Sequence, residues 1–161
     1  MPFKFRILPS SELCLLGYTG HVSASDLDGV WKATQTTADY STELDDLVVL
    51  GPDAEYSEVA TRLTQEHARK FVEMYSVEDR RPTKIAHVCA NEMQVTMVRM
   101  FAAYIDSFAS KGAQLGWFAD LKSALTWIEL GRASNCRIER AKVVRLLREM
   151  GHGWCCLQWP V

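Results

Sequence analysis

Short apolar runs alternate along this chain with longer segments whose apolar residues recur every three or four positions. Five runs have the length and composition of strands: 4–8, 13–19, 46–51, 83–90 and 113–119. Four segments have helical periodicity: about 25–38, 55–74, 92–110 and 121–130. The sequence "PSSE" between the first two strands suits a hairpin turn, whereas a helix separates each later pair. The pattern predicts an α/β domain with a mixed five-stranded sheet.

Polar residues at the helix starts have simple structural interpretations. Ser25 and Asp26 are candidate N-caps of the first helix, because short side-chain oxygens accept the free amide protons of a first turn. Asp120 precedes an amphipathic segment in which Leu121, Ala124, Leu125 and Ile128 recur at helical spacing. A cap at Asp120 explains that carboxylate better than a catalytic acid does.

The predicted strands are apolar on both of their alternating sets of side chains. Ile85, His87 and Cys89 point to one face, and the alanines and valine between them point to the other. A sheet with one wet face would alternate apolar with polar residues, so both faces need a cover. If the helices up to residue 130 lie on one face, then residues 132–161 or a second subunit must cover the other.

The composition changes after Gly131. Six basic residues face two acidic ones between Arg132 and Glu149, a net charge of +4 in a chain whose total is −2. We therefore divide the chain into an α/β domain, 1–131, and an extension, 132–161, that packs on the domain or on a partner subunit. The extension contains a basic helix with a plausible cap at Gly151 and an aromatic end. It supplies the candidate partner-binding residues: Arg140, Arg145, Arg148, Trp154 and Trp159.

Several classes of protein are disfavoured. The net charge does not suit a nucleic-acid binder, and no apolar run approaches the roughly 18 residues of a membrane span. The first residues lack a signal-peptide pattern, so we expect a cytoplasmic protein with free thiols on its five cysteines. His152, Cys155 and Cys156 make a poor zinc set, since adjacent cysteines rarely aim at one ion. We expect no metal and no cofactor.

No phosphate-binding loop, nucleophile elbow, zinc-protease motif or dinucleotide fingerprint occurs. A ligand site, if present, is expected near the carboxyl ends of the strands, where α/β sheets usually bind ligands. Those ends and the helix that follows the fourth strand provide the candidate ligand-binding residues: His21, Ser23, Asp53, Asn91, Glu92, Met93 and Met97. The two methionines suit either a core or an adaptable apolar pocket.

The order of elements, the turn "GYTGHVSASDL" and the ending "WFADLKSALTWIE" resemble the small bacterial SpoIIAA-like proteins, relatives of the STAS domain. The likeness covers residues 4–130 and is shared more distantly with CRAL-TRIO lipid carriers. It implies a βα superhelix, a mixed sheet with helices largely on one face, and a regulatory module more than an enzyme. Phosphorylated members carry a serine after an acidic residue. Here Ser57 follows Tyr56, so the phosphoserine is not carried over.

We therefore expect a STAS-like, non-catalytic binding or regulatory module that forms a homodimer and binds a small apolar or anionic ligand or a protein partner. A first alternative is a hydrolase-type enzyme that uses His21 with Glu92 or Asp53 as acid–base groups. A second alternative is a docking module that binds an acidic partner through the basic helix 137–149.

Overall fold

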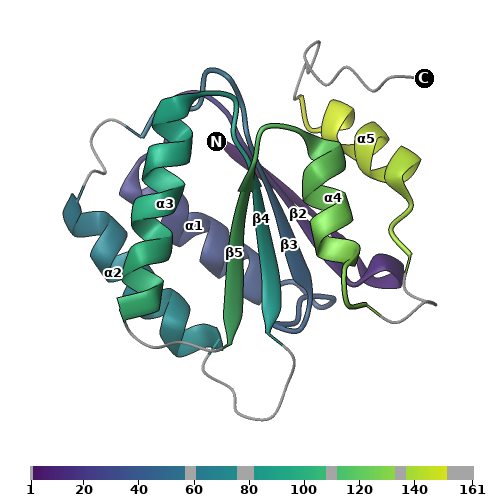
Figure 1. Ribbon diagram of the computed structural model, residues 1–161, viewed down its shortest axis with the longest axis horizontal. Helices are drawn as coiled ribbons and strands as arrows, with labels where there is room; N and C mark the ends of the chain where they lie inside the picture. The colour runs from purple at the N-terminus through teal and green to yellow at the C-terminus, as the bar shows by residue number, and fades with distance from the viewer. Residues whose placement is uncertain (1, 57–60, 76–81, 108–111, 133–136, 152–161) are drawn as a thin grey trace.

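The computed structural model describes residues 2–56, 61–75, 82–107, 112–132 and 137–151. A mixed sheet with the strand order β1-β2-β3-β4-β5 lies at its centre (Figure 1). The strands are β1 (Phe3–Leu8), β2 (Leu13–Tyr18), β3 (Asp45–Leu50), β4 (Thr83–Val88) and β5 (Ala113–Phe118). Strand β1 runs antiparallel to β2, and the remaining pairs are parallel. The prediction of an α/β fold with a mixed five-stranded sheet is confirmed.

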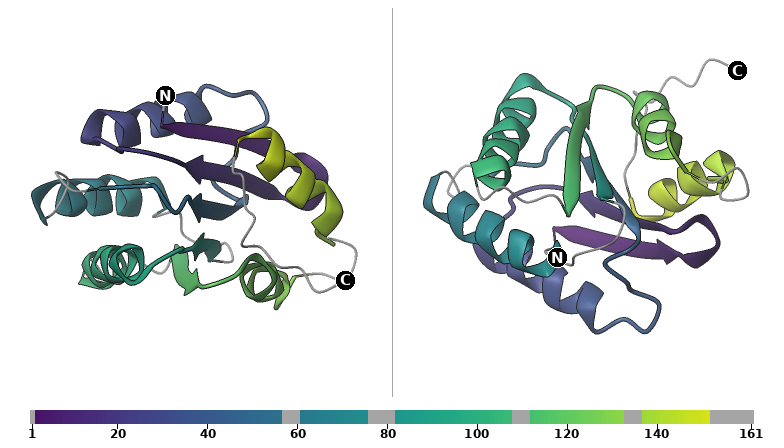
Figure 2. Two further views of the ribbon diagram at one scale, coloured as in Figure 1. Left: turned by 90° about the horizontal axis from the view of Figure 1, so that it is seen from above. Right: turned by 60° about the horizontal axis from the view of Figure 1, so that its bottom comes forward.

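Helices cover both faces of this sheet. They are α1 (Ala24–Gln35), α2 (Thr61–Tyr75), α3 (Glu92–Ser107), α4 (Leu121–Glu129) and α5 (Arg140–Glu149). Helices α1, α2 and α3 lie on one face, and α4 and α5 lie on the other (Figure 2). Each face has its own hydrophobic core. The prediction that both faces are apolar and covered is therefore confirmed.

The placement of α4 corrects the expectation that the helices up to residue 130 share one face. Its apolar stripe packs against β3, β4 and β5 on the side away from α1–α3. Seven buried strand side chains of β1–β4 point to that side and need a cover: Leu8, Leu13, Leu15, Leu47, Val49, Ala86 and Val88. Helix α5 completes the layer with Val143, Leu147 and Met150, all of them buried. The cover of the second face thus comes from both sides of Gly131.

Three local predictions need correction. The N-cap of α1 is Ser23, whose Oγ accepts from the Asp26 amide (3.3 Å), while Asp26 Oδ2 accepts from the Ser23 amide (2.8 Å). This capping box starts the helix earlier than a cap at Ser25 or Asp26 would. The second helix does not include Glu55, which forms a β-bridge with His21. Residues 57–60, which precede α2, lie outside the described residues.

The third correction concerns the inward face of α3. Met93 was predicted to lie on that face but is 81% exposed, and Gln94, which is 2% exposed, lies inward instead. Gln94 Nε2 donates to the Gly51 carbonyl (2.8 Å), and its Oε1 accepts from the Ala90 amide (2.7 Å). A buried amide whose donor and acceptor are both satisfied ties the loop after β3 to α3, and hydrophobic periodicity gives no sign of it.

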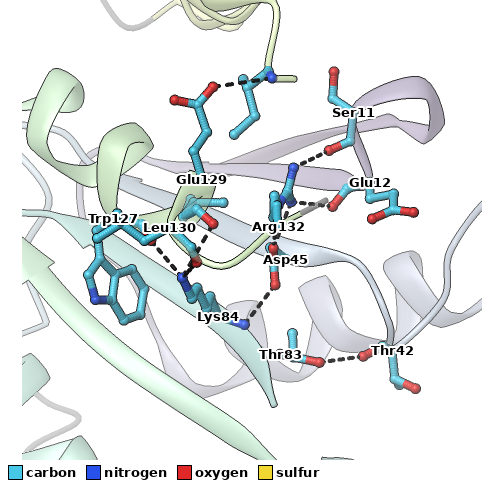
Figure 3. Close-up of polar contacts among 12 residues, drawn as sticks. Ser11, Glu12, Thr42, Asp45, Thr83, Lys84, Trp127, Glu129, Leu130 and Arg132 are labelled. Carbon is cyan, nitrogen blue, oxygen red and sulfur yellow. Dashed lines mark hydrogen bonds and ion pairs between the residues drawn. The ribbon is translucent and has the colours of Figure 1, made fainter. Parts of the chain in front are cut away.

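A buried ion pair attaches the segment after α4 to the sheet (Figure 3). Arg132 Nη2 lies 2.6 Å from Asp45 Oδ2, and Nε lies 2.9 Å from the same oxygen. The guanidinium also donates to the carbonyls of Ser11 (2.7 Å) and Glu12 (3.0 Å). Asp45 Oδ1 accepts from the Lys84 amide (2.8 Å). One side chain therefore joins the β1–β2 turn, β3 and the start of the extension.

Lys84 satisfies backbone carbonyls at the C-terminal end of α4 (Figure 3). Its Nζ donates to the Trp127 carbonyl (2.8 Å) and to the Leu130 carbonyl, and lies over the Trp127 ring, 5.2 Å from the ring centroid. A cation at a helix C-terminus satisfies free carbonyls and opposes the negative end of the helix dipole. The helix is thus fixed at its start by Asp120 and at its end by the sheet.

Candidate functional site

A cavity of about 150 Å³ lies between the sheet and the layer formed by α1, α2 and α3. Strands β2, β3 and β4 form its floor, and the three helices form its roof. Most of the roof is apolar: Leu27, Val30, Trp31, Phe71, Met97, Val98 and Phe101. In the layer of α4 and α5, Leu125 and Ile128 are fully buried. The cavity lies on the opposite side of the sheet, beneath α1–α3.

Two polar residues of the floor lie side by side. Cys14 on β2 and Asp46 on β3 are register partners, so both side chains point to the cavity face. They are hydrogen bonded to each other. Burial, reinforced by the charge of Asp46, raises the pKa of the Cys14 thiol far above its usual range. Because the thiolate is the nucleophile, this cysteine is inert at neutral pH.

Asp46 makes the floor electronegative. The carboxylate is 7% exposed and lies at the start of a strand that is otherwise apolar on this face. Burial raises the pKa of the Tyr18 hydroxyl, and the charge of Asp46 raises it further. The Cys14 thiol and the Tyr18 hydroxyl are both held in their neutral forms, so the cavity disfavours additional negative charge.

His87 on β4 is the second titratable group of the floor. It lies on the same face as Asp46 because the register pairs are Asp46 with Ile85 and Val48 with His87. Burial lowers the pKa of His87 to about 4, with partial opposition from a hydrogen bond to the backbone of Gly116. The ring is therefore neutral at pH 7. Its Nδ1 is buried and has no hydrogen-bond partner among the described residues.

A third polar group, His67, belongs to the roof. Its ring packs against Trp31 with centroids 5.2 Å apart, and its Nε2 lies 3.6 Å from Asp28 Oδ1. Lys70 Nζ lies 3.0 Å from the same carboxylate oxygen. Asp28 is partly exposed, so this network leads from the cavity wall to the surface between α1 and α2. His67 itself is buried, as expected of a histidine that packs in a core.

The cavity extends along the strands, from Cys14 and Asp46 near their amino ends to Tyr18 and Leu50 at their carboxyl ends, whereas the sequence predicted a site at the carboxyl ends alone. Of the candidate ligand-binding residues, Met97 lines it. Several of the others shape loops: Ser23 caps α1, and Asp53 Oδ2 accepts from the Gly20 amide at 3.1 Å. Asn91 Oδ1 accepts from the Gln94 amide (3.0 Å) in the first turn of α3, to which Glu92 also belongs.

The residues of the enzyme alternative lie outside the cavity. His21 is exposed and belongs to a bridge with Glu55. None of His21, Asp53 and Glu92 is among the described residues that line the hollow. They follow the carboxyl ends of β2, β3 and β4, and all three are exposed.

Two of the candidate partner-binding arginines have partners within the chain. Arg140 Nη2 lies 2.5 Å from Glu129 Oε2, and Arg145 Nε lies 3.7 Å from Glu149 Oε1. Arg148 is exposed. Trp154 and Trp159 lie outside the described residues. These ion pairs neutralise part of the positive charge that the basic helix would need to bind an acidic partner.

Sequence reasoning missed Asp46 and Trp31 as lining residues. Two aspartates in succession at the start of a buried strand were the available signal for Asp46, because alternation sends one to each face. Trp31 lies in the first predicted helix, but helical periodicity cannot distinguish a filled core from one that contains a cavity. His87 was predicted to point to one face of its strand, and that face lines the cavity, as does Cys14 on β2.

Other kinds of site find little support in the described part of the chain. No group of three or more histidine, cysteine or acidic side chains there is placed to hold a metal ion. None of the helices in these ranges is long and apolar enough to cross a membrane. Comparisons of the chain with protein-family models, curated proteins and solved structures found no match. In the described part of the chain, the cavity is therefore the feature that bears most directly on function.

Proposed function

We propose that this protein is a non-catalytic binding module that holds a compact, largely apolar ligand between the sheet and helices α1–α3. The cavity carries this proposal. A partly open cavity of about 150 Å³ with mostly apolar walls is the size that accepts a benzene-sized molecule. Ligand sites are usually mostly apolar concavities with a few placed polar groups, and this cavity has that composition.

The polar groups of the cavity favour binding over catalysis. Cys14 is held as the neutral thiol, which is a poor nucleophile, and His87 is held as the neutral ring with a pKa of about 4. A general base works best with a pKa near the operating pH. The electronegative floor also favours a neutral or cationic ligand over the anionic ligand that the sequence left open.

The STAS-like assignment belongs to this proposal. Its support is the element order, strand–strand–helix followed by strand–helix units, which matches the order that suggested the likeness. A regulatory role would follow if a ligand under the roof changed how α1–α3 pack. Homodimerisation is proposed through β5, an edge strand on which Trp117 is 41% exposed. A cytoplasmic location stays a prediction from the sequence.

Filling the cavity tests the proposal. Met97→Trp replaces a flexible side chain of the cavity wall with a bulky ring that should fill the space. Met93→Trp makes the same change one turn earlier on α3, at an exposed position. We expect toluene to raise the melting temperature of the wild type and of Met93→Trp, and not that of Met97→Trp. Thermal denaturation with and without toluene measures this, because a ligand of the folded state stabilises it by mass action.

Methyl chemical shifts locate the binding site in the same experiment. Toluene should perturb the methyl groups of Leu16, Val30 and Val98, which line the cavity, and not those of Leu125, which lies in the opposite layer. Absence of any toluene binding to the wild type, or equal binding by Met97→Trp, would contradict the proposal.

A further inference from the structure

Two hydrogen-bond acceptors share the floor of the cavity. The Asp46 carboxylate and the His87 ring lie on adjacent strands and on the same face of the sheet, two residues apart in register. A carboxylate offers only acceptor sites, and a neutral imidazole offers one donor and one acceptor. What the floor offers a ligand here therefore depends on which of these donor and acceptor sites already have partners within the protein.

His87 has one polar contact with the backbone. The ring lies next to the backbone of Gly116 on β5, and a neutral imidazole carries one donor and one acceptor nitrogen. Buried Nδ1 has no hydrogen-bond partner in the described chain. A buried polar atom without a partner is uncommon in folded proteins and calls for one.

Two of the donors that line the cavity are used within the protein. The Cys14 thiol is hydrogen bonded to Asp46. Thr34 Oγ1 donates within α1 to the carbonyls of Val30 (3.1 Å) and Trp31 (3.0 Å). At Asp46 and His87 the floor therefore presents acceptors to a guest, and most of the surrounding wall is apolar.

We propose that the cavity selects a ring-sized ligand that carries an N–H or O–H donor, as an aromatic amine or a phenol does, with the donor directed to Asp46 and His87. The ring fills the apolar space beneath Trp31, Phe71 and Phe101. This inference rests on the proposed function. The proposed function describes the apolar part of the ligand, and this inference adds the donor group that the ligand carries.

The proposal separates ligands of equal size. Toluene, aniline and phenol differ by a methyl, an amino and a hydroxyl group on the same ring, so shape is nearly constant and donor capacity is not. Isothermal titration calorimetry of the wild-type protein at pH 7 is expected to give aniline and phenol dissociation constants about tenfold below that of toluene. Benzoate, an anion, is expected not to bind.

Substitutions of the two acceptors identify the floor as the source of this preference. His87→Phe and Asp46→Leu should each remove most of the preference for aniline over toluene and leave toluene binding within about twofold. The matched controls are His21→Phe and Asp53→Leu, the same changes at residues that do not line the cavity. The controls should keep the wild-type ratio.

The outcomes distinguish the two proposals. If toluene binds and aniline and phenol bind no more tightly, the donor selection is wrong and the apolar cavity stands. If none of the three binds, the proposed function itself is wrong. The wild-type ratio decides the question even if a cavity variant fails to fold, because it requires no substitution.

Discussion

Asp45 and Asp46 are adjacent acidic residues whose side chains point to opposite faces of the same strand. Asp45 faces the α4–α5 layer, where Arg132 and the Lys84 amide satisfy it. Asp46 faces the cavity beside Cys14. The two carboxylates are chemically identical, and the alternation of side chains along a strand gives one of them a structural role and the other a position in the candidate site.

The Arg132–Asp45 pair should be costly to break. Arg132→Met leaves a buried carboxylate without its cation, and removal of one partner from a buried pair typically costs about 3–5 kcal/mol. Urea unfolding should show that loss of stability. Arg148→Met is the control, since this arginine is exposed and an exposed substitution usually stays within about 0.5 kcal/mol. Equal effects of the two changes would contradict the role given to Arg132.

His87 should make stability depend on pH. Its pKa is about 4 in the folded chain and near 6.5 when unfolded, so below pH 6.5 the unfolded state takes up a proton that the folded state refuses. Stability attributable to His87 is complete above pH 6.5 and falls by about 3 kcal/mol as the pH drops to 4. Urea unfolding across this range should give a shallower slope for His87→Leu.

The wild-type slope should be retained by His21→Leu, because His21 is exposed and does not line the cavity. The other titratable groups of the cavity wall, Asp46, Cys14, Tyr18 and His67, are present in both variants and cancel in the comparison. An unchanged slope in His87→Leu would show that the ring is not held neutral by burial.

At the scale of elements, α4 is the helix whose two ends are explained most completely. Asp120 Oδ1 accepts from the Ser123 amide (2.7 Å), and Oδ2 accepts from the Ser123 hydroxyl (2.8 Å). The backbone bond at Ser123 is the main reason that the pKa of Asp120 is lowered. Lys84 satisfies the carbonyls at the other end. The prediction of a cap at Asp120 is confirmed.

Asp120→Ala should cost about 1 kcal/mol in chemical unfolding, because the amide loses its acceptor. Asp120→Asn should retain most of the stability, since asparagine is an equally good N-cap. The advantage of the wild type over Asp120→Asn should vanish as the pH falls through the lowered pKa of Asp120, where the carboxylate becomes protonated. A full loss in the asparagine variant would point to a role for the charge beyond capping.

At the scale of the whole molecule, the sheet separates the α4–α5 layer from the layer that holds the cavity. Helix α5 buries Val143 and Leu147 in the core of the α4–α5 layer. The layer beneath α1–α3 has the free space that a ligand needs. Functional sites commonly depart from optimal core packing.

Truncation after Gly131 should therefore expose the apolar face beside α4. It removes Arg132 and α5 together, so we expect aggregation or self-association and a lower melting temperature, measured by light scattering and thermal denaturation. Leu147→Asp in the full chain should reproduce much of the loss, because Leu147 is fully buried. A truncated chain that stays monomeric and equally heat-stable would refute this account of the second face.

The candidate site was predictable only in part. Met97 was identified because its helical stripe is local information. Asp46 and His87 became neighbours through the pairing of β3 with β4, and Met93 lost its inward place to Gln94, whose partners lie in the loop after β3. Each of these outcomes depends on contacts between residues about 40 positions apart, which no periodic pattern records.

The sequence by itself determined the α/β class, the strands and most helix positions, because side-chain periodicity, caps and turn residues act within a few residues. Tertiary structure alone decided which face α4 covers, that Arg132 pairs with Asp45, and that the space beneath α1–α3 is not filled. Those properties depend on how the volumes and charges of distant segments fit together when they pack, and no local pattern in the sequence records that fit.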